Sequence, residues 1–527
     1  MPNYDDLLKK LQDDLKRPRN IIDGKYVDTA KTTTIINPLD GTDMFTQPDT
    51  QVDEIKPFLD SLAKCPKSGR HNPTRFMDRG VNRYLMLGEV SRKASNALKD
   101  SDVADYFARL IQKVMPKSYA QAMAEVTVTG NFLANFSGDN VRYLAEGKSS
   151  PGDRAGQQPQ DYFWPYGPVA IIAPFNFPLE IPALQLMGAL YMGNKPLLKT
   201  ARTVEPVLDQ FILLLHYCGL PMEDVDLMHC SGSVMNELLK RGKDIIRLVQ
   251  FTGSSKVAEE ISLIMHGKVR IEDAGFDWKI LGPDFKAKNI PYVAWQSDQC
   301  AYAASGNKCS AQSLLIAHTN WVKGGFFEEI EKLASTRNLK DLTVGPCLSV
   351  STEVMLDHVK KLLTIPGAKL LFGGKELTGH CIPKNYGAIL PTAVFVPLKE
   401  ILRSKYFDLV TTEIFGPFQV VTEFSDKELP LVLEACERMK NHLTAGIVSN
   451  DALFIDEVLG KTVNGVTYYG DLARDTGAPQ NHGFNPCGDP RGCIIGTKFG
   501  IQFTWAFSRV IIRDVGPIDY SAKLVQS

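Results

Sequence analysis

The sequence predicts an α/β protein that combines a parallel sheet of the nucleotide-binding type with a second α/β region. From Gly167 to Asp273, short apolar runs of strand length alternate with segments of helical pattern. Such alternation indicates parallel strands covered by helices. A second alternation begins near residue 278. The 527 residues are also too many for one small core, so two or three domains are expected.

The part before this alternation has a different pattern. The chain opens with an amphipathic helix, and GKYVDTAKTTTIINPLDG then indicates short strands closed by an Asp-Gly turn. Residues 57–144 have a helical pattern. The next stretch, EGKSSPGDRAGQQPQDYFWPYG, is rich in Gly, Pro, Gln and Ser. It predicts an arm that leaves the core and ends in a strand.

Within the first alternation, VAIIAP and KPLLK are predicted strands with a helix between them over residues 181–192. A helix over residues 204–217 ends at a Gly and Pro stop signal. VDLMH, IIRLVQFTG and VRIED continue the series of strands. The second region contains SLLIAH, a helix over residues 321–336, AVFVPL and QVVTEF. The aromatic and β-branched segment GTKFGIQFTWAFSRVIIRD predicts a terminal strand, either at an edge within this chain or in a neighbouring subunit.

Composition excludes several classes of partner. The formal net charge is −1, so no basic excess is present to meet the phosphates of a nucleic acid. The most apolar stretch contains Asn176, Glu180 and several prolines, which is wrong for a membrane span. The expected partner is a small molecule, with neither nucleic acid nor membrane.

The ten cysteines are scattered, without C-x-x-C motifs or His/Cys clusters, so no metal is expected. Free thiols in a reducing compartment are the natural state for a chain of this size. The N-terminus, MPNYDDLLKKLQDDLKR, shows no secretory signal, and its four aspartates do not suit a mitochondrial transit peptide. The protein is expected to be cytosolic, or to have lost a presequence.

Two positions suit a nucleotide. FTGSSKVAEEI places Gly253 and Ser254 between a strand and a helix, where free N–H groups and the helix dipole favour a phosphate. An ordinary helix cap has the same pattern. Lys199 closes the strand PLLK, at the sheet edge where such folds bind ligands. There it is either a ribose or phosphate contact or a solvated lysine.

Three further stretches carry polar groups that suit catalysis or cofactor binding. Asn176 stands in the apolar run IAPFNFP, where it either satisfies backbone groups or offers its NH₂ to an oxyanion. Glu272 ends the strand VRI beside small residues, as a general base would, although an exposed acid has the same pattern. In TTEIFGP, Glu413 and Phe415 stand where they could contact a ribose and a flat ring.

Cys309, in SGNKCSAQ, is the cysteine best placed to react. Gly306 and Ser310 leave space beside it, and Lys308 is an adjacent cation that favours a thiolate. A helix that starts near Ser310 would add its dipole. The alternative, a small buried packing residue, fits poorly with these polar flanks.

Taken in order, APFNFP, PLLK, FTGS, the Glu272 segment, SGNKCSA and EIFGP resemble the aldehyde dehydrogenase superfamily. The resemblance implies an aldehyde dehydrogenase-like fold with a Rossmann-type nucleotide-binding domain, an α/β catalytic domain and a small oligomerisation arm. The boundaries it implies are 1–143 and 166–276 for the NAD-binding domain, 277–480 for the catalytic domain, and 144–165 and 500–527 for oligomerisation.

The resemblance also implies roles for single residues. Cys309 matches the nucleophile, Glu272 the general base and Asn176 the oxyanion amide. The cofactor is NAD. Its matching contacts are Lys199 for the adenosine ribose, Gly253 and Ser254 for the pyrophosphate, and Glu413 and Phe415 for the nicotinamide half.

The chain departs from the superfamily pattern in three places. EDAGFDWKILGPD keeps only Glu272 and Gly275 of the usual Glu-Leu-Gly-Gly-Lys string, and DTGAPQNHGFNPCGDPRG replaces Pro-Phe-Gly-Gly. Arg202 stands where many members have a ribose-binding glutamate. Because an arginine could face a 2′-phosphate, the preference for NAD over NADP stays open.

GFDWKILGPD, SGNKCSAQS and PFNFPLEIPALQLMGALYMGNKP resemble one branch, the plant-type Δ1-pyrroline-5-carboxylate dehydrogenases. Membership of that branch implies NAD-dependent oxidation of L-glutamate 5-semialdehyde to L-glutamate in proline degradation. It also implies a location in the mitochondrial matrix and a homo-oligomer, either a dimer or a tetramer. The substrate-binding residues that it implies are Ser310, Phe177, Gly477, Ala478 and Phe484.

Three other functions stay open from the sequence. The first is oxidation of a different semialdehyde by the same chemistry. The second is a non-redox cysteine hydrolase that uses Cys309, Asn176 and Glu272. The third is an inactive member that serves as a scaffold.

Overall fold

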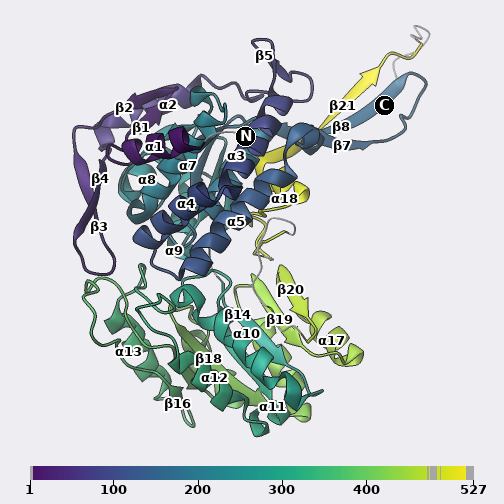
Figure 1. Cartoon of the computed structure of the whole chain (residues 1–527). Coiled ribbons are helices and arrows are strands. Elements are labelled where there is room, and N and C mark those ends of the chain that lie inside the picture. Colours follow the sequence, from purple (N-terminus) through teal and green to yellow (C-terminus); the bar gives the residue numbers. More distant parts are fainter. Residues whose placement is uncertain (1–3, 274, 472–473, 475–482, 487, 518–527) are drawn as a thin grey trace.

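Two seven-stranded sheets, each covered by helices on both faces, organise the chain, and an arm projects from the half that holds the first sheet (Figure 1). The computed structural model describes residues 4–273, 275–471, 474, 483–486 and 488–517. Among these residues, no helix has the length and apolar character that crossing a membrane requires.

The first sheet confirms the predicted parallel arrangement. Five of its strands are parallel, with β9 in the middle of the five, β10 and β11 on one side and β12 and β13 on the other, while β1 joins β11 in antiparallel fashion. The order therefore reverses beside β9, and ligands of such sheets bind at the carboxyl ends of strands at this point. The strands are β13 (Val269–Glu272), β12 (Leu248–Thr252), β9 (Pro168–Ile172), β10 (Lys195–Lys199), β11 (Asp226–Leu227), β1 (Asn20–Ile22) and β2 (Lys25–Val27).

Alternate side chains of β9 enter two different cores, because successive side chains of a strand point to opposite faces. Val169 and Ile171 join the core under the N-terminal helices, whereas Ala170 and Ile172 join the core on the other face. The helices on the first face are α1 (Asp5–Asp14), α3 (Arg83–Lys99), α4 (Ser101–Val114), α5 (Tyr119–Asn135), α6 (Glu180–Tyr191) and α7 (Glu205–Tyr217). Those on the second are α2 (Lys56–Ala63), α8 (Gly232–Gly242) and α9 (Ser255–Ile264).

Short elements complete this half. The predicted strands before residue 50 are confirmed as the hairpin of β3 (Thr32–Ile36) and β4 (Asp43–Pro48), with Gly41 at positive φ in its turn. A small hairpin, β5 (Met77–Asp78) and β6 (Val81–Asn82), interrupts the predicted helical region. The 3-10 helices in the described part of the chain are η1 (Val52–Glu54), η2 (Gly138–Ala145), η3 (Arg202–Val204), η4 (Met222–Asp224), η5 (Ala287–Asn289), η6 (Ala303–Gly306) and η7 (Asp426–Glu428).

The second sheet is parallel except at its edge strand β16. Its strands, in spatial order, are β16 (Lys369–Phe372), β17 (Thr392–Phe395), β18 (Phe418–Phe424), β15 (Gln312–His318), β14 (Asp277–Leu281), β19 (Thr444–Val448) and β20 (Val466–Tyr469). One face carries α10 (Ile290–Tyr302), α11 (Thr319–Lys323) and α12 (Phe326–Ser335). The other carries α13 (Thr352–Leu362), α14 (Leu398–Ile401), α15 (Ser404–Val410), α16 (Leu429–Arg438) and α17 (Ala452–Leu459).

The prediction of one helix over residues 321–336 is wrong. Two helices, α11 and α12, occupy this stretch, and the chain turns between them at Gly324 and Gly325. Gly325 has a φ of +85°, a left-handed conformation that ends a helix and that glycine adopts at little cost.

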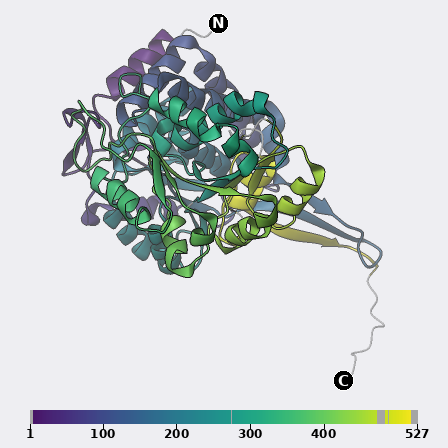
Figure 2. The same cartoon turned by 90° about the horizontal axis from the view of Figure 1, so that it is seen from below.

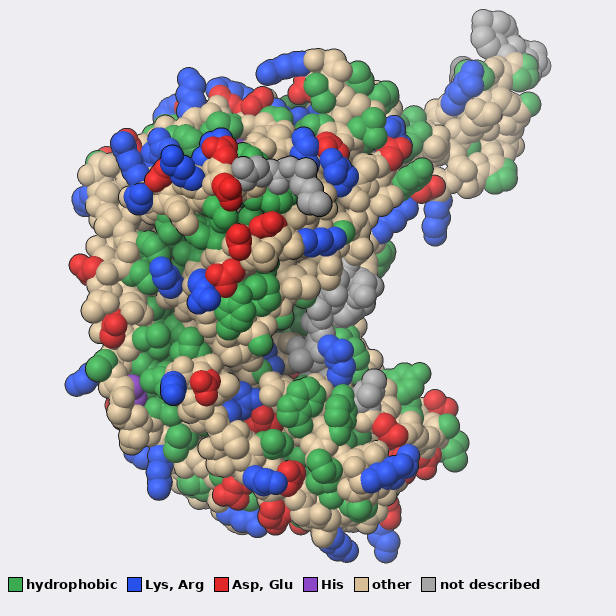
Figure 3. Space-filling model, in the orientation of Figure 1, with side chains coloured by type: hydrophobic (Ala, Val, Ile, Leu, Met, Phe, Trp, Pro, Cys, Tyr) green, Lys and Arg blue, Asp and Glu red, His purple; other side chains and the backbone are tan. Residues whose placement is uncertain are grey.

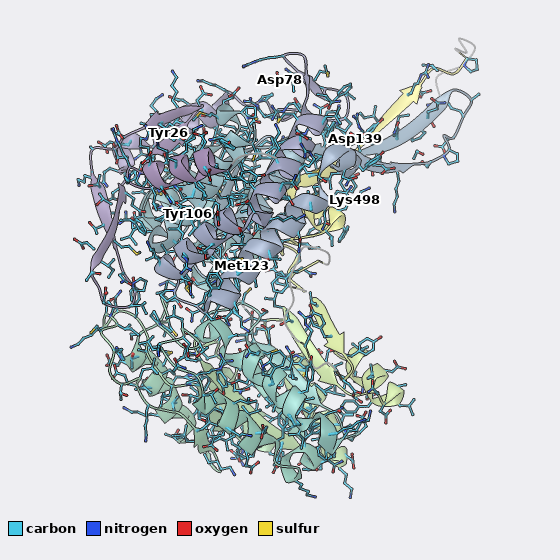
Figure 4. The ribbon with its side chains drawn as sticks, in the orientation of Figure 1. Tyr26, Asp78, Tyr106, Met123, Asp139 and Lys498 are labelled. Atoms are coloured by element: carbon cyan, nitrogen blue, oxygen red, sulfur yellow. The ribbon has the colours of Figure 1, made fainter. Side chains whose placement is uncertain are left out.

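The arm is a three-stranded antiparallel sheet that stands away from the rest of the molecule in both views (Figures 1 and 2). It consists of β7 (Glu146–Ser149), β8 (Gln157–Pro165) and β21 (Ala506–Asp514), with β8 in the middle. Lys498 and Asp139 lie near its base (Figure 4). Of the two predictions for the terminal strand, pairing within the chain is the one observed, since β21 pairs with β8 along its whole length.

The first part of that terminal segment is not a strand as predicted, but the helix α18 (Lys498–Trp505). The Thr497 hydroxyl caps its first turn by accepting from the N–H of Gly500. Ile501 and Trp505 are buried in the core of the first half. The apolar side chains that suggested a strand therefore belong to a helix that packs against α6.

Candidate active site

A cavity of about 300 Å³ is lined by residues of both halves. The first half contributes side chains from α5, from the segment between β9 and α6, and from the end of β13, while the second contributes α10, η6 and the loop before β15. The space-filling view shows this side of the molecule hollowed between the halves (Figure 3). Five predicted site residues line the cavity together: Cys309, Glu272, Ser310, Phe177 and Phe484.

A strained loop presents Cys309. Residues 304–306 all have positive φ, from 52° to 66°, a conformation that costs non-glycine residues free energy. A Cβ on Gly306 would lie 1.9 Å from the carbonyl oxygen of Gly416, so only glycine fits this contact. The Asn307 side chain donates to the carbonyl of Phe415 at 3.1 Å. The loop of Cys309 and the loop of Phe415 are therefore locked together.

Two predicted means of favouring the Cys309 thiolate are wrong. A turn, not a helix, follows the cysteine, and β15 begins at Gln312. The Lys308 ammonium points to the end of α10, where it donates to the carbonyls of Gln299 and Cys300 at 3.0 and 2.8 Å. Burial, together with the nearby Glu272 carboxylate, raises the pKa of the Cys309 thiol well above its usual value. The thiol is therefore protonated at rest.

Glu272 ends β13 and is only 2% exposed. Burial raises the pKa of its carboxyl group to about 7, while the Cys309 thiol acts in the opposite direction as a hydrogen-bond donor. Neither carboxyl oxygen has a well-aligned hydrogen bond to the residues that the structure describes. On the outer edge of β13, the carbonyl of Arg491 and the N–H of Cys493 pair with Ile271. β13 is thus held by β12 on one side and by residues 491–493 on the other. The carboxyl group at its end, that of Glu272, has a pKa near neutrality.

Asn176 lies between β9 and α6, next to Phe177 in the chain, but unlike Phe177 it is not among the described residues that line the cavity. Its side chain is 2% exposed, and its carboxamide oxygen accepts no hydrogen bond from the described part of the chain. A buried amide without full pairing is costly. The unpaired oxygen is an acceptor and cannot itself bind an oxyanion, so that role would fall to the NH₂ group of the same amide.

A buried ion pair, which the sequence interpretation missed, holds the Asn176 segment. The Lys117 ammonium is 2.9 Å from the Glu125 carboxylate, donates to the carbonyl of Asn176 at 2.8 Å and lies 4.5 Å from the centre of the Phe177 ring. The other Glu125 oxygen accepts from the N–H groups of Leu179 and Glu180, at the start of α6. One signal was available: Glu125 is the only charged residue between Lys117 and Asp139, which is typical of a buried, paired charge.

The predicted nucleotide contacts gather at the carboxyl edge of the first sheet. Lys199 ends β10 and is 8% exposed. Ser254 is the N-cap residue of α9, whose first-turn N–H groups have no partners within the helix. The N–H of Gly253 already donates to the Glu272 carbonyl at 3.0 Å, so Gly253 shapes the turn without offering this donor. These groups fit a pyrophosphate and a ribose at the point where the strand order reverses.

Glu413 and Phe415 stand on the loop between α15 and β18. Burial raises the pKa of the Glu413 carboxyl group to about 8, although the backbone of Gly275 donates a hydrogen bond to it. Phe415 has a φ of 54° and its ring packs edge-on against Phe175, with the centroids 5.9 Å apart. The loop therefore reaches the segment between β9 and α6.

Arg202 lies in η3, directly after β10, and its guanidinium forms an ion pair with Asp49 at the end of β4. The Gln47 amide donates to the Arg202 carbonyl at 3.1 Å. The sequence interpretation missed Asp49, because 153 residues separate it from its partner. The arginine charge is thus largely neutralised within the chain.

Two predicted substrate contacts, Gly477 and Ala478, lie outside the described residues. Arg474, which the sequence interpretation also missed, is described and lines the cavity. Ser310 and Phe484 line the same cavity, and the guanidinium group of Arg474 suits an anionic substrate group.

Comparison with known proteins decides the family. The profile of the aldehyde dehydrogenase family matches residues 26–483. The chain belongs to the aldehyde dehydrogenase family. It is 55% identical over 501 residues to the Linum usitatissimum protein named "Probable aldehyde dehydrogenase", which covers 95% of this chain and 90% of that protein.

Two further family members are similar. Delta-1-pyrroline-5-carboxylate dehydrogenase 12A1, mitochondrial, of Arabidopsis thaliana is 54% identical over 510 residues, 97% of this chain and 90% of that protein. The structure of betaine aldehyde dehydrogenase from Staphylococcus aureus in complex with NAD⁺ aligns with a TM-score of 0.81 at 18% identity, covering 98% and 99% of the two chains. The latter likeness shows the shared aldehyde dehydrogenase fold.

We predict that Lys117→Met lowers both stability and turnover. Leaving Glu125 buried without its cation costs about 3–5 kcal/mol of unfolding free energy. Loss of the Asn176 anchor lowers kcat roughly 10- to 100-fold, because small misplacements in an active site are costly. Chemical denaturation and steady-state kinetics measure the two effects.

The control is Lys56→Met, which removes an exposed ion pair with Asp60 and should change stability by less than about 0.5 kcal/mol. If Lys117→Met were no less stable than this control, the buried pair would not hold the segment.

Proposed function

We propose that this protein is an NAD-dependent dehydrogenase that oxidises L-glutamate 5-semialdehyde to L-glutamate, as in proline degradation. One observation carries the proposal: the Cys309 thiol meets a carboxyl group of pKa about 7, Glu272, in a cavity beside the carboxyl edge of the first sheet. The substrate follows from the resemblance to the Arabidopsis thaliana enzyme, whose name gives Δ1-pyrroline-5-carboxylate. That compound is the cyclic form of the semialdehyde.

The first step begins with proton transfer from the Cys309 thiol to Glu272, which burial has made basic enough to accept it. The thiolate attacks the aldehyde carbon and forms a thiohemiacetal. The Asn176 carboxamide and the backbone N–H of Cys309 stabilise the oxyanion. Bound NAD would supply the hydride acceptor for this carbon, and loss of the hydride would leave a thioester on Cys309.

Glu272 first passes the proton from the thiol to solvent. It then takes a proton from a water molecule, and the hydroxide attacks the thioester, releasing the acid product and the Cys309 thiolate. The thiolate takes up the proton that Glu272 holds, and the cycle is complete. Both roles of Glu272 require a carboxylate that is accessible to the cavity and that titrates near neutrality.

The residues that would hold NAD are Lys199 at the adenosine ribose, Ser254 with the first turn of α9 at the pyrophosphate, and Glu413 and Phe415 at the nicotinamide half. Gly253 gives the turn its shape. Two features support this assignment: the Lys199 ammonium group at the end of β10 and the N–H groups at the N-terminus of α9.

For the substrate, we assign the carboxylate to Ser310 and Arg474, and the aliphatic chain to Phe177 and Phe484, since all four line the cavity. Gly477 and Ala478 remain predictions for the carboxylate. A cation and a hydroxyl group that line the same cavity suit an aldehyde that ends in a carboxylate.

We further infer that residues 1–143 and 166–276 form the NAD-binding domain, that 277–480 form the catalytic domain, and that 144–165 and 500–527 serve a homo-oligomer. The arm supports the last assignment, because Val510 and Ile512 on its edge strand are more than half exposed. The name of the Arabidopsis thaliana relative supports a mitochondrial location.

The central test is NADH formation from Δ1-pyrroline-5-carboxylate, followed by absorbance. Cys309→Ala should abolish it, because no other described cavity-lining residue is a cysteine. The control is Cys381→Ala, which changes an exposed thiol and should leave the rate unaltered. Acid product without NADH would contradict the proposal and favour a hydrolase, and equal rates on succinate semialdehyde would contradict the substrate assignment.

The pH profile should report Glu272. Because the base acts only when deprotonated, and its pKa is about 7, kcat should rise with pH between roughly 6 and 8. Glu272→Gln should lose this rise and slow turnover roughly 10²- to 10⁴-fold. A wild-type profile that falls over this range would assign the titration to another group.

The Arg202–Asp49 pair should set cofactor preference. Asp49→Asn keeps the shape of the side chain but releases the arginine charge, so NADP should bind roughly tenfold more tightly, through its 2′-phosphate, while NAD changes little. Fluorescence titration of the apoenzyme measures both Kd values. Adding Arg202→Met should abolish the gain, and an unchanged Kd for NADP in Asp49→Asn would show that Arg202 lies away from the 2′ position.

A further inference from the structure

One wall of the cavity carries a carboxyl group that the proposed mechanism leaves unused. Glu180 is the first residue of α6 and lines the cavity with Cys309 and Glu272. Its backbone N–H is bound by Glu125. Its carboxyl group makes no hydrogen bond or ion pair within the described part of the chain. An acid without a partner in a ligand cavity calls for an explanation.

The other charged groups nearby are already engaged. Both oxygens of Glu125 are occupied, one by the Lys117 ammonium and the other by the start of α6. Lys117 in turn contacts Glu125, the carbonyl of Asn176 and the ring of Phe177. Glu272 is the proposed base. Among the described acids that line the cavity, Glu180 is therefore the one without a role.

The surroundings of Glu180 favour a cation in the cavity. Burial, and then the Glu125 carboxylate, raise the pKa of the Glu180 carboxyl group to about 8, with a smaller contribution from Glu272, and Lys117 offsets only part of this. A cation bound beside such a group stabilises its carboxylate form and relieves the repulsion among the three acids. Arg474 lines the same cavity but is assigned to the carboxylate of the substrate.

We propose that Glu180 binds the α-ammonium group of the substrate, so that the cavity selects an amino-acid aldehyde over a semialdehyde without an amino group. This inference rests on the proposed function and deepens it. The aldehyde of the zwitterionic substrate contacts the Cys309 thiol. Its α-carboxylate contacts Ser310 and Arg474, and its α-ammonium group contacts Glu180. L-Glutamate 5-semialdehyde and 5-oxopentanoate differ only in that group, so they test the contact with Glu180 directly.

The test compares these two aldehydes as substrates of the wild-type enzyme, Glu180→Gln and Glu180→Leu. The measured quantity is the ratio of kcat/KM for the amino aldehyde to that for 5-oxopentanoate. Loss of a charged hydrogen-bond partner should lower this ratio roughly 10- to 100-fold, mainly through KM for the amino aldehyde. The matched control, Glu457→Gln, alters an exposed glutamate on α17 and should leave the ratio unaltered.

Calorimetric binding of L-glutamate and of glutarate gives a readout that is independent of turnover. The wild-type enzyme should prefer L-glutamate, and both Glu180 variants should lose that preference while thermal unfolding shows them folded. A ratio and a preference that persist in both variants would overturn the inference and leave the proposed function standing. Failure of the wild-type enzyme to oxidise L-glutamate 5-semialdehyde would overturn the proposed function, and the inference with it.

Discussion

The ion pair of Lys117 and Glu125 holds together the segment on which the candidate site depends. Taking both charges out of water is expensive, and a buried pair is tolerated only when its remaining hydrogen-bonding capacity is used. Here the ammonium also binds the carbonyl of Asn176, and the carboxylate also binds two N–H groups at the start of α6. The charges are thereby satisfied, and α5 and the turn after β9 become one rigid wall. Asn176, Phe177 and Glu180 take their positions from that wall.

Burial, rather than any neighbouring cation, sets the chemistry inside the cavity. The pKa of Glu272 rises to about 7 and that of Glu180 to about 8, while the thiol of Cys309 also becomes harder to ionise. A thiol that is neutral at rest is protected from adventitious reaction. Its activation must then pass through Glu272, because the ammonium of Lys308 is directed toward the end of α10. This coupling makes the nucleophile and the base one functional unit.

Much of the fold was predictable because its signals are local. VAIIAP and the central residues of KPLLK are apolar runs of strand length, and both form buried strands. The errors have equally specific causes. Ala304 and Ser305 take left-handed conformations that no propensity indicates, and the chain after Cys309 enters β15 at Gln312 instead of starting the expected helix. In GTKFGIQFTW, the side chains of Ile501 and Trp505 pack into the first core, and this tertiary contact outweighs strand propensity.

By itself, the sequence determined the α/β alternation, the order of the motifs, and the identity of Cys309, Glu272 and Asn176 as the set worth testing. These are patterns of residue types along the chain, and they can be recognised before any packing partner is known. Only the tertiary structure decided which charges meet. Lys117 lies 59 residues from Asn176, and Asp49 lies 153 residues from Arg202. The pKa values were likewise decided by burial, which depends on what packs around a carboxyl group rather than on its neighbours in the chain.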